Sequence, residues 1–252
     1  MEIITVDQSN IESEHICCAI SDKKGETCVS SKKAWMKARF ADGLVFKKLD
    51  VRGKVFIEYI PAEKAWCPTT ADGYMHINCF WVSGQFKGQG YANQLLTECM
   101  RDAKAQGRCG LTVLSSAKKM PFLSDPGFLK HKGFIVADKA EPYYELLYLP
   151  FESGAPVPQF RDCAKQAKID ETGMVLYYSN QCPHTDKYAP LIQKIAERHG
   201  ATVKLYKIAT TQEAQSAPTP FTTYSFFFEG KFVTNEIFSE KKFEKFLDEN
   251  EY

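Results

Sequence analysis

The sequence lacks the long apolar runs and the one-sided charge that mark membrane proteins and nucleic-acid-binding proteins. No stretch approaches the roughly 18 consecutive apolar residues that span a bilayer. Lys and Arg total 32 against 31 Asp and Glu, a formal net charge of +1, so no overall field favours nucleic acid or an anionic membrane. The N-terminal segment is acidic and has no basic stretch leading into an apolar one, which disfavours a secretory signal. We therefore expect a cytoplasmic protein with neither nucleic-acid nor membrane partners.

The cysteines lack the even number and regular spacing of a disulfide framework. Nine cysteines in 252 residues favour reduced thiols in the cytosol. The adjacent pair Cys17–Cys18 has no second pair at zinc-site spacing, so we interpret it as part of a helical core and expect no metal centre.

A stretch rich in proline and glycine divides the chain. With 44% hydrophobic and 25% charged residues, the composition supplies apolar side chains for two cores. Three prolines and one glycine fall within residues 150–158, and proline continues neither a helix interior nor a sheet ladder. We predict a first domain over residues 1–150, a linker with a short helix over 151–171, and a second domain over 172–252.

In the first domain, an apolar strand is predicted over residues 75–82 and an amphipathic helix over residues 90–106. Gly107 stands where a C-terminal cap is expected. A second apolar strand follows at 111–114. Further helices are expected over 11–20 and 31–40, and further strands over 44–49, 54–60, 134–137 and 143–149.

The turn between that strand and that helix is the most informative segment. Its residues are Lys87, Gly88, Gln89, Gly90, Tyr91 and Ala92. Glycine lets the backbone approach an anion closely, and the first N–H groups of a helix are unpaired and carry the positive end of its dipole. A tight packing turn is the alternative. The strand before, the helix after and the charge of Lys87 favour a diphosphate instead. A Rossmann site or a P-loop is disfavoured because the third glycine and the Gly-Lys-Ser/Thr sequence are missing.

The turn resembles the acetyl-CoA signature of the GNAT acetyltransferases, Gln/Arg-x-x-Gly-x-Gly/Ala, with Lys87 in the first place. Residues 128–134, Phe-Leu-Lys-His-Lys-Gly-Phe, resemble the closing motif of that family. The resemblance covers roughly residues 1–150, and the whole arrangement is similar to the YoaP-like subfamily. It implies an α/β fold: a mixed α+β GNAT fold with a central mixed sheet, followed by a small thioredoxin-like α/β domain.

The resemblance also implies how acetyl-CoA, the expected co-substrate, is bound. In this family the strand before the turn splays from its parallel neighbour, and pantetheine enters the gap. Trp81 and Val82 are then expected to pair with pantetheine, and the amides of residues 87–92 to hold the pyrophosphate. Ser115, at the end of the second splayed strand, is a further expected contact. The implied activity is transfer of an acetyl group from acetyl-CoA to a small-molecule or peptide amine, by direct attack on the thioester.

Acetyl transfer needs one group that takes the amine proton and another that protonates the leaving thiolate. Glu58 lies between two apolar residues of one strand face and is the candidate base, with a solvent-facing strand glutamate as the alternative. Leu129 occupies the family's usual tyrosine position, so Tyr143 or Tyr144 is the substitute acid, with ordinary packing as the alternative. His76 is interpreted as a satisfied core histidine rather than a proton shuttle.

In the second domain, a strand, a helix and a strand are followed by two strands and a helix, an order that resembles the thioredoxin fold. The Cys182-Pro183-His184-Thr185 segment stands at the redox position. A helix N-terminus favours the thiolate form of Cys182, but Thr185 replaces the second cysteine and excludes a dithiol cycle within the motif. Pro218 or Pro220, preferably Pro220, is expected to be cis.

Three functions are weighed for the whole chain. The first is an N-acetyltransferase whose second domain acts as a scaffold or recruits the substrate. The second is a thiol-redox or thiol-binding module at Cys182, fused to an acyl-CoA-binding domain. The third is a catalytically silent CoA-binding interaction protein. The acceptor is not specified, although Glu58, Glu63 and Asp72 mildly favour a cationic amine. A homodimer is left open.

Overall fold

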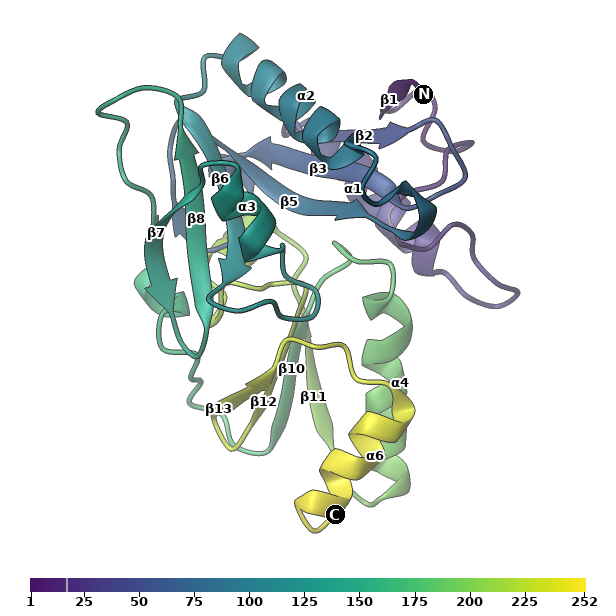
Figure 1. Cartoon of the computed structure of the whole chain (residues 1–252). Coiled ribbons are helices and arrows are strands. Elements are labelled where there is room, and N and C mark those ends of the chain that lie inside the picture. The colour runs from purple at the N-terminus through teal and green to yellow at the C-terminus, as the bar shows by residue number, and fades with distance from the viewer. Residues whose placement is uncertain (17) are drawn as a thin grey trace.

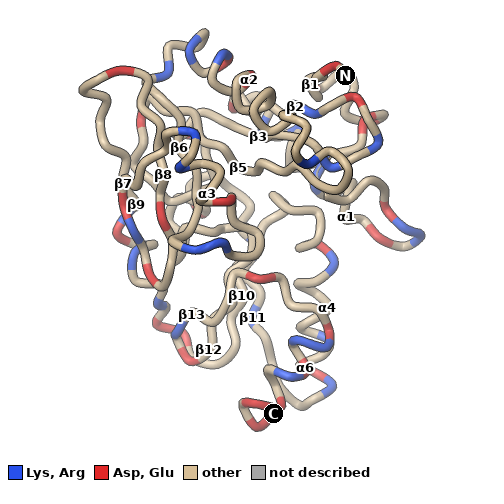
Figure 2. Tube along the Cα trace, in the orientation of Figure 1, with Lys and Arg blue, Asp and Glu red and all other residues tan. Residues whose placement is uncertain are grey.

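The computed structural model describes residues 1–16 and 18–252. Figure 1 shows two sheet-containing parts, one above the other, with the N-terminus at the upper end and the C-terminus at the lower end. Across the described residues, no helix has the length and apolar character needed to cross a membrane. Figure 2 shows basic and acidic residues interspersed over both parts.

The first part contains a seven-stranded sheet in the order β1-β2-β3-β5-β6-β8-β7. Its strands are β1 (Ile3–Val6), β2 (Val45–Leu49), β3 (Val55–Pro61), β5 (Tyr74–Val82), β6 (Gly110–Ser116), β7 (Ile135–Ala140) and β8 (Tyr144–Pro150). All neighbours pair antiparallel except β5 and β6, which are parallel. The central mixed sheet expected from the sequence is therefore confirmed.

Helices cover this sheet on both faces. The apolar stripe of α2 (Tyr91–Ala105) packs on one face, where Leu95 and Cys99 are fully buried. The short helix α3 (Pro126–His131) contributes Leu129 to the same core. The helix α1 (Cys28–Phe40) packs on the opposite face through Trp35 and Met36. Figure 1 shows the second part of the chain on the side of the sheet away from α2.

The helix predicted over residues 11–20 is wrong for the described residues 11–16 and 18–20, which form turns and irregular chain. The Asn10 carboxamide accepts from the Asp7 N–H at 2.9 Å, and the Asp7 carboxylate accepts from the Ser9 N–H at 2.8 Å. These bonds form a turn just before the segment. Within it, Lys33 Nζ of α1 donates to the Glu12 carbonyl at 2.9 Å and Lys48 Nζ of β2 to the Glu14 carboxylate at 2.7 Å, so tertiary contacts take the place of helical ones. Of the predicted Cys17–Cys18 pair, Cys17 lies outside the described residues, and Cys18 is half-buried.

The second part contains a four-stranded sheet in the order β11-β10-β12-β13. Its elements are β10 (Met174–Tyr178), α4 (Thr185–Arg198), β11 (Val203–Lys207), α5 (Thr211–Gln215), β12 (Tyr224–Phe228), β13 (Lys231–Thr234) and α6 (Glu240–Glu249). The predicted order of strands and helices is observed, with α5 added. Membership of the thioredoxin-like folds stays a prediction. The cis-proline expectation is wrong, because the one cis peptide bond of the described residues precedes Pro142.

The predicted linker packs against the first part rather than running free. Its strand β9 (Gln159–Phe160) pairs antiparallel with β4 (Thr69–Thr70), and the Phe160 side chain is buried. The helix expected after Phe160 is reduced to a short 3-10 turn over Asp162–Ala164. Two more 3-10 turns, at Ala62–Lys64 and Gly84–Phe86, lie in the first part. The domain boundaries at residues 150 and 172 stay predictions.

Candidate active site

The parallel pair β5–β6 opens into a gap partway along its length. The two strands pair only from Tyr74 with Gly110 to Ile77 with Val113, although both run further. Asn78 forms a bulge at that point, since Ile77 and Cys79 are paired with consecutive residues of β3. A bulge bends its strand and disrupts the local ladder. The end of β5 therefore diverges from β6, as the resemblance implied.

A cavity of about 640 Å³ opens beside this gap on the α3 side, a size typical of small-molecule sites. Its walls come from the end of β5, the turn before α2, the loop after β6, and α3. The lining residues are Phe80, Trp81, Val82, Lys87, Ala92, residues 119–125, Phe128 and Leu129. Four predicted cofactor residues, Trp81, Val82, Lys87 and Ala92, thus line one groove. We call it the coenzyme groove.

The other residues of the predicted turn lie at the N-terminus of α2, next to this groove. Gly90 is the N-cap of α2, with φ +81° and no capping side chain, and Gly88 has φ +75°. A Cβ placed on either glycine would meet no atom within 4 Å. Open space therefore faces unpaired helical amides, an arrangement that fits a diphosphate group. Gln89 donates to the Gln85 carbonyl instead of filling that space.

Ser115 supports one wall of the coenzyme groove. Its hydroxyl is buried and donates to the carbonyl of Ser124 at 2.7 Å. This bond fixes the loop after β6, and that loop forms one wall of the coenzyme groove. Ser115 itself does not belong to the lining, so a direct contact with acetyl-CoA stays a prediction.

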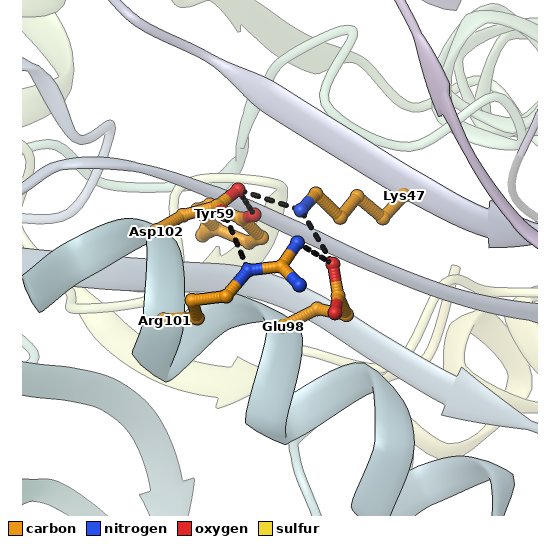
Figure 3. Close-up of polar contacts among 5 residues, drawn as sticks. All are labelled: Lys47, Tyr59, Glu98, Arg101 and Asp102. Atoms are coloured by element: carbon orange, nitrogen blue, oxygen red, sulfur yellow. Dashed lines mark hydrogen bonds and ion pairs between the residues drawn. The ribbon is translucent and has the colours of Figure 1, made fainter. Parts of the chain in front are cut away.

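A polar network clamps α2 to the sheet (Figure 3). Lys47 of β2 contacts Glu98 at 2.9 Å and Asp102 at 2.7 Å, and the Tyr59 hydroxyl donates to Asp102 at 2.6 Å. Burial and then the Asp102 carboxylate raise the pKa of Tyr59 far above its usual value, so the phenol stays protonated. The network positions the helix whose N-terminus faces the groove. In the sequence, this network is indicated only by Lys47, a charged residue within the predicted strand 44–49.

A second, smaller cavity of about 30 Å³ lies where the second part of the chain, the predicted second domain, meets the gap. It shares Phe122, Leu123 and Ser124 with the coenzyme groove, so the two spaces adjoin. The other lining residues are Trp66, Cys67, His76, Asn78, Leu114, Gln181, Pro220, Phe221, Thr222 and Thr223. We call this space the interdomain pocket. Sequence reasoning did not predict it, although a polar Asn78 inside an apolar strand was a signal.

Glu58 lies near the interdomain pocket but lines neither cavity. Its side chain is 1% exposed and pairs with Lys32 Nζ at 2.6 Å. The Asn78 carboxamide donates to the other carboxylate oxygen at 3.2 Å. Asn78 therefore stands between Glu58 and the pocket, and the role of Glu58 as general base stays a prediction.

His76 is a buried histidine that also lines the interdomain pocket. Its Nδ1 lies 3.0 Å from the Thr112 hydroxyl. Burial lowers the pKa of His76 to about 4, so the imidazole is neutral near pH 7. Thr112 is thus the hydrogen-bond partner expected for a buried His76. In addition, the His76 side chain lines a cavity next to the gap.

Tyr143 contacts the second domain rather than the coenzyme groove. Its hydroxyl donates to the Asn235 carboxamide, and its ring packs on Tyr144 and Phe232. Burial raises the pKa of Tyr143. Leu129, in the family's tyrosine position, does line the groove. A role for Tyr143 as general acid stays a prediction that these contacts do not favour.

Cys182 differs from the thiolate expected at a helix N-terminus. Burial raises its pKa to about 12, and the nearby charges of Lys32 and Glu58 change it less. The thiol is therefore protonated near neutral pH, since desolvation outweighs the favourable amides of α4. Over residues 1–16 and 18–252, no group of three or more His, Cys, Asp or Glu is placed to hold a metal.

Residues 15–121 match the family described as acetyltransferase (GNAT) family, and residues 203–245 match the YoaP-like family. A Bacillus subtilis protein described as uncharacterized N-acetyltransferase YoaP is 44% identical over 245 residues, which cover 97% of this chain and 98% of that protein. The chain therefore belongs to the YoaP-like GNAT N-acetyltransferases. It is an N-acetyltransferase, and acetyl-CoA is the co-substrate of this class of enzyme.

Several solved structures are similar to the chain at low identity. A GNAT-family acetyltransferase from Brucella melitensis in complex with acetyl-CoA is 15% identical, with a TM-score of 0.40 over 64% of this chain and 92% of that one. The ribosomal-protein-S18-alanine N-acetyltransferase from Escherichia coli is 12% identical, with a TM-score of 0.41 over 61% of this chain and 95% of that one.

Proposed function

We propose that the protein transfers the acetyl group of acetyl-CoA to a primary amine of a small molecule or peptide, by direct attack on the thioester. One observation supports this most strongly. The coenzyme groove ends at the β5–β6 gap, beside a second pocket with which it shares Phe122, Leu123 and Ser124. Two adjoining spaces suit two substrates whose reacting atoms meet between them, and such proximity supplies much of the rate of group transfer.

In this proposal the chain holds acetyl-CoA through backbone and charge. The amides at the N-terminus of α2 and the ammonium group of Lys87 bind the pyrophosphate, because both favour an anion. The unpaired edge of β5 at Trp81 and Val82 pairs with the amides of pantetheine. The loop after β6, fixed by the bond from Ser115 to Ser124, closes the opposite wall.

Two residues are candidates for receiving the amine proton. His76 lines the interdomain pocket and is neutral near pH 7, so it can accept a hydrogen bond from the amine and orient it, while its pKa of about 4 makes it a weak base that hands the proton on to water. Glu58 is the base predicted from the sequence, but it reaches the pocket only through Asn78. We therefore place Glu58 as a positioning residue for Asn78 and His76 as the catalytic candidate. In this arrangement Tyr143 stays bonded to Asn235.

The test has a binding step and a turnover step. Isothermal titration calorimetry with acetyl-CoA should show binding, and an amine panel should release free CoA in its presence. His76→Phe should lower kcat while acetyl-CoA affinity is kept. No acetyl-CoA binding, or binding without CoA release with any amine, would refute the proposed reaction.

The site disfavours the thiol-based alternative, because a protonated Cys182 is a poor nucleophile. We also propose that the protein works in the cytoplasm. This is supported by the described cysteines, which are free thiols, as expected of a reducing compartment.

A further inference from the structure

We propose that the second domain completes the acceptor site, and that the interdomain pocket selects an amine carried on a compact, uncharged body. This inference rests on the proposed acetyl transfer and adds to it the class of acceptor and the residues that choose it. Gln181 and Thr222 of the second domain are the specificity-determining residues.

The position of the interdomain pocket makes it the acceptor side of the gap. His76 and Asn78 reach it from β5, and Leu114 reaches it from β6, so the pocket spans the point where the two strands diverge. On the other side of the gap lies the coenzyme groove. An amine in the pocket would therefore approach a thioester in the groove from the opposite side.

Hydrogen bonds across the domain boundary hold the second-domain wall of the pocket. The Gln181 carboxamide donates to the Thr222 hydroxyl at 2.8 Å, and that hydroxyl donates to the Trp66 carbonyl of the first domain. The Trp66 indole N–H donates to the Thr211 hydroxyl at 3.1 Å. Trp66 also lines the pocket, so the domain contact and the pocket wall are one structure.

The lining contains no Asp, Glu, Lys or Arg. Glu58, which is bonded to the lining residue Asn78, is neutralised by Lys32 at 2.6 Å. Glu63 is paired with Arg108 at 3.0 Å. Asp72 is exposed in the turn that precedes the first residue of β5, Tyr74. None of the three acids that favoured a cationic acceptor is available to the pocket. An acceptor with a second positive charge, besides its reacting amine, would bury that charge without a carboxylate to pair with it. Such burial is costly.

The small volume of the pocket favours a compact acceptor. A volume of about 30 Å³ admits only a few atoms, since one water needs roughly 10–15 Å³ of such space. Trp66, Phe122 and Phe221 enclose it. The pocket therefore takes the amine with a small attached group, and it excludes a bulky or branched neighbour.

The experiment places a carboxylate in the wall. Gln181→Glu keeps the size of the side chain and replaces the donating amide by a charged acceptor, to which the Thr222 hydroxyl can donate instead. Gln193→Glu on α4, which lines neither cavity, is the matched control. Both are assayed with acetyl-CoA and three probe amines of similar size: ethylamine and glycinamide with uncharged bodies, and ethylenediamine with a cationic one. Acetyl-CoA affinity is measured for each variant by calorimetry.

We expect wild type to prefer the uncharged-body amines by at least about tenfold in kcat/KM, as expected for a desolvated charge. Gln181→Glu should shift this preference about tenfold toward ethylenediamine, through acceptor KM, with acetyl-CoA affinity kept. Gln193→Glu should behave as wild type. If Gln181→Glu fails to fold, Thr222→Val replaces it and should raise the acceptor KM.

The failures are distinguishable. Wild type that prefers ethylenediamine, or a Gln181→Glu enzyme that binds acetyl-CoA normally but keeps the wild-type preference, overturns the assigned acceptor class while leaving acetyl transfer intact. Acetyl-CoA binding without CoA release from any amine refutes the proposed reaction itself, and the acceptor assignment falls with it.

Discussion

Lys32 Nζ lies 2.6 Å from a carboxylate oxygen of Glu58, and the two side chains are 0% and 1% exposed. The lysine comes from α1 and the glutamate from β3, so the pair joins a helix to the sheet beneath it. A buried ion pair stabilises a fold only weakly relative to apolar residues. Losing one partner is costly, because the remaining charge stays buried.

Glu58→Gln should therefore destabilise the protein by about 3 kcal/mol, since it replaces the charged carboxylate of a buried ion pair by a neutral amide. Urea unfolding measures the effect, and the double variant Lys32→Met/Glu58→Gln should recover much of the loss. The exposed pair Glu12–Lys37 supplies the control, because Glu12→Gln should leave the midpoint unchanged. The kinetics of the double variant test the general-base prediction. A kcat near wild type would reject a catalytic role for Glu58.

Gly90→Val should weaken acetyl-CoA binding by about tenfold or more. A β-branched residue is strained at φ +81°, and relief of that strain displaces the helical amides from the groove. Gly154→Val is the matched control, because Gly154 also has positive φ and open space, but lies in the linker. Calorimetry should show normal affinity for that control. Equal affinities for both variants would mean that the turn serves packing alone.

Stability should fall as the pH drops from about 6.5 toward 4, because of His76. The folded pKa is lowered to about 4 from 6.5 by burial, so the unfolded chain takes up the proton first. Stability is thus fully present above pH 6.5, and its loss amounts to about 3 kcal/mol once the pH is below both pKa values. Urea midpoints of wild type and His76→Gln across this range measure it. Parallel pH dependence in the two proteins would contradict the assignment.

Cys182 should react slowly with iodoacetamide near pH 7.5, because burial keeps its thiol protonated. The exposed Cys163 is the internal reference, and peptide mass spectrometry follows both in one sample. Cys163 should be modified at least about tenfold faster, while both should be modified readily in urea. Faster labelling of Cys182 would restore the thiol-based alternative.

Much of the site was predictable because it is encoded locally. The two glycines and Lys87 follow a strand and precede an amphipathic helix, and that order alone predicts open amides facing an anion. The apolar stripe over residues 90–106 likewise predicted α2 to within one residue at each end. The helix over residues 11–20 was mispredicted because Glu12, Glu14 and His15 bond to residues far along the chain, and apolar spacing does not register such bonds.

The strand–turn–helix that faces the coenzyme groove is encoded in the local sequence, because each part depends on neighbours a few residues away. The surroundings of the reacting centre are set by tertiary contacts. These contacts pair Glu58 with Lys32, set Asn78 between Glu58 and the pocket, and bring Gln181 and Thr222 against Trp66 from more than a hundred residues along the chain. Burial and pKa depend on such distant contacts, and local pattern does not record them.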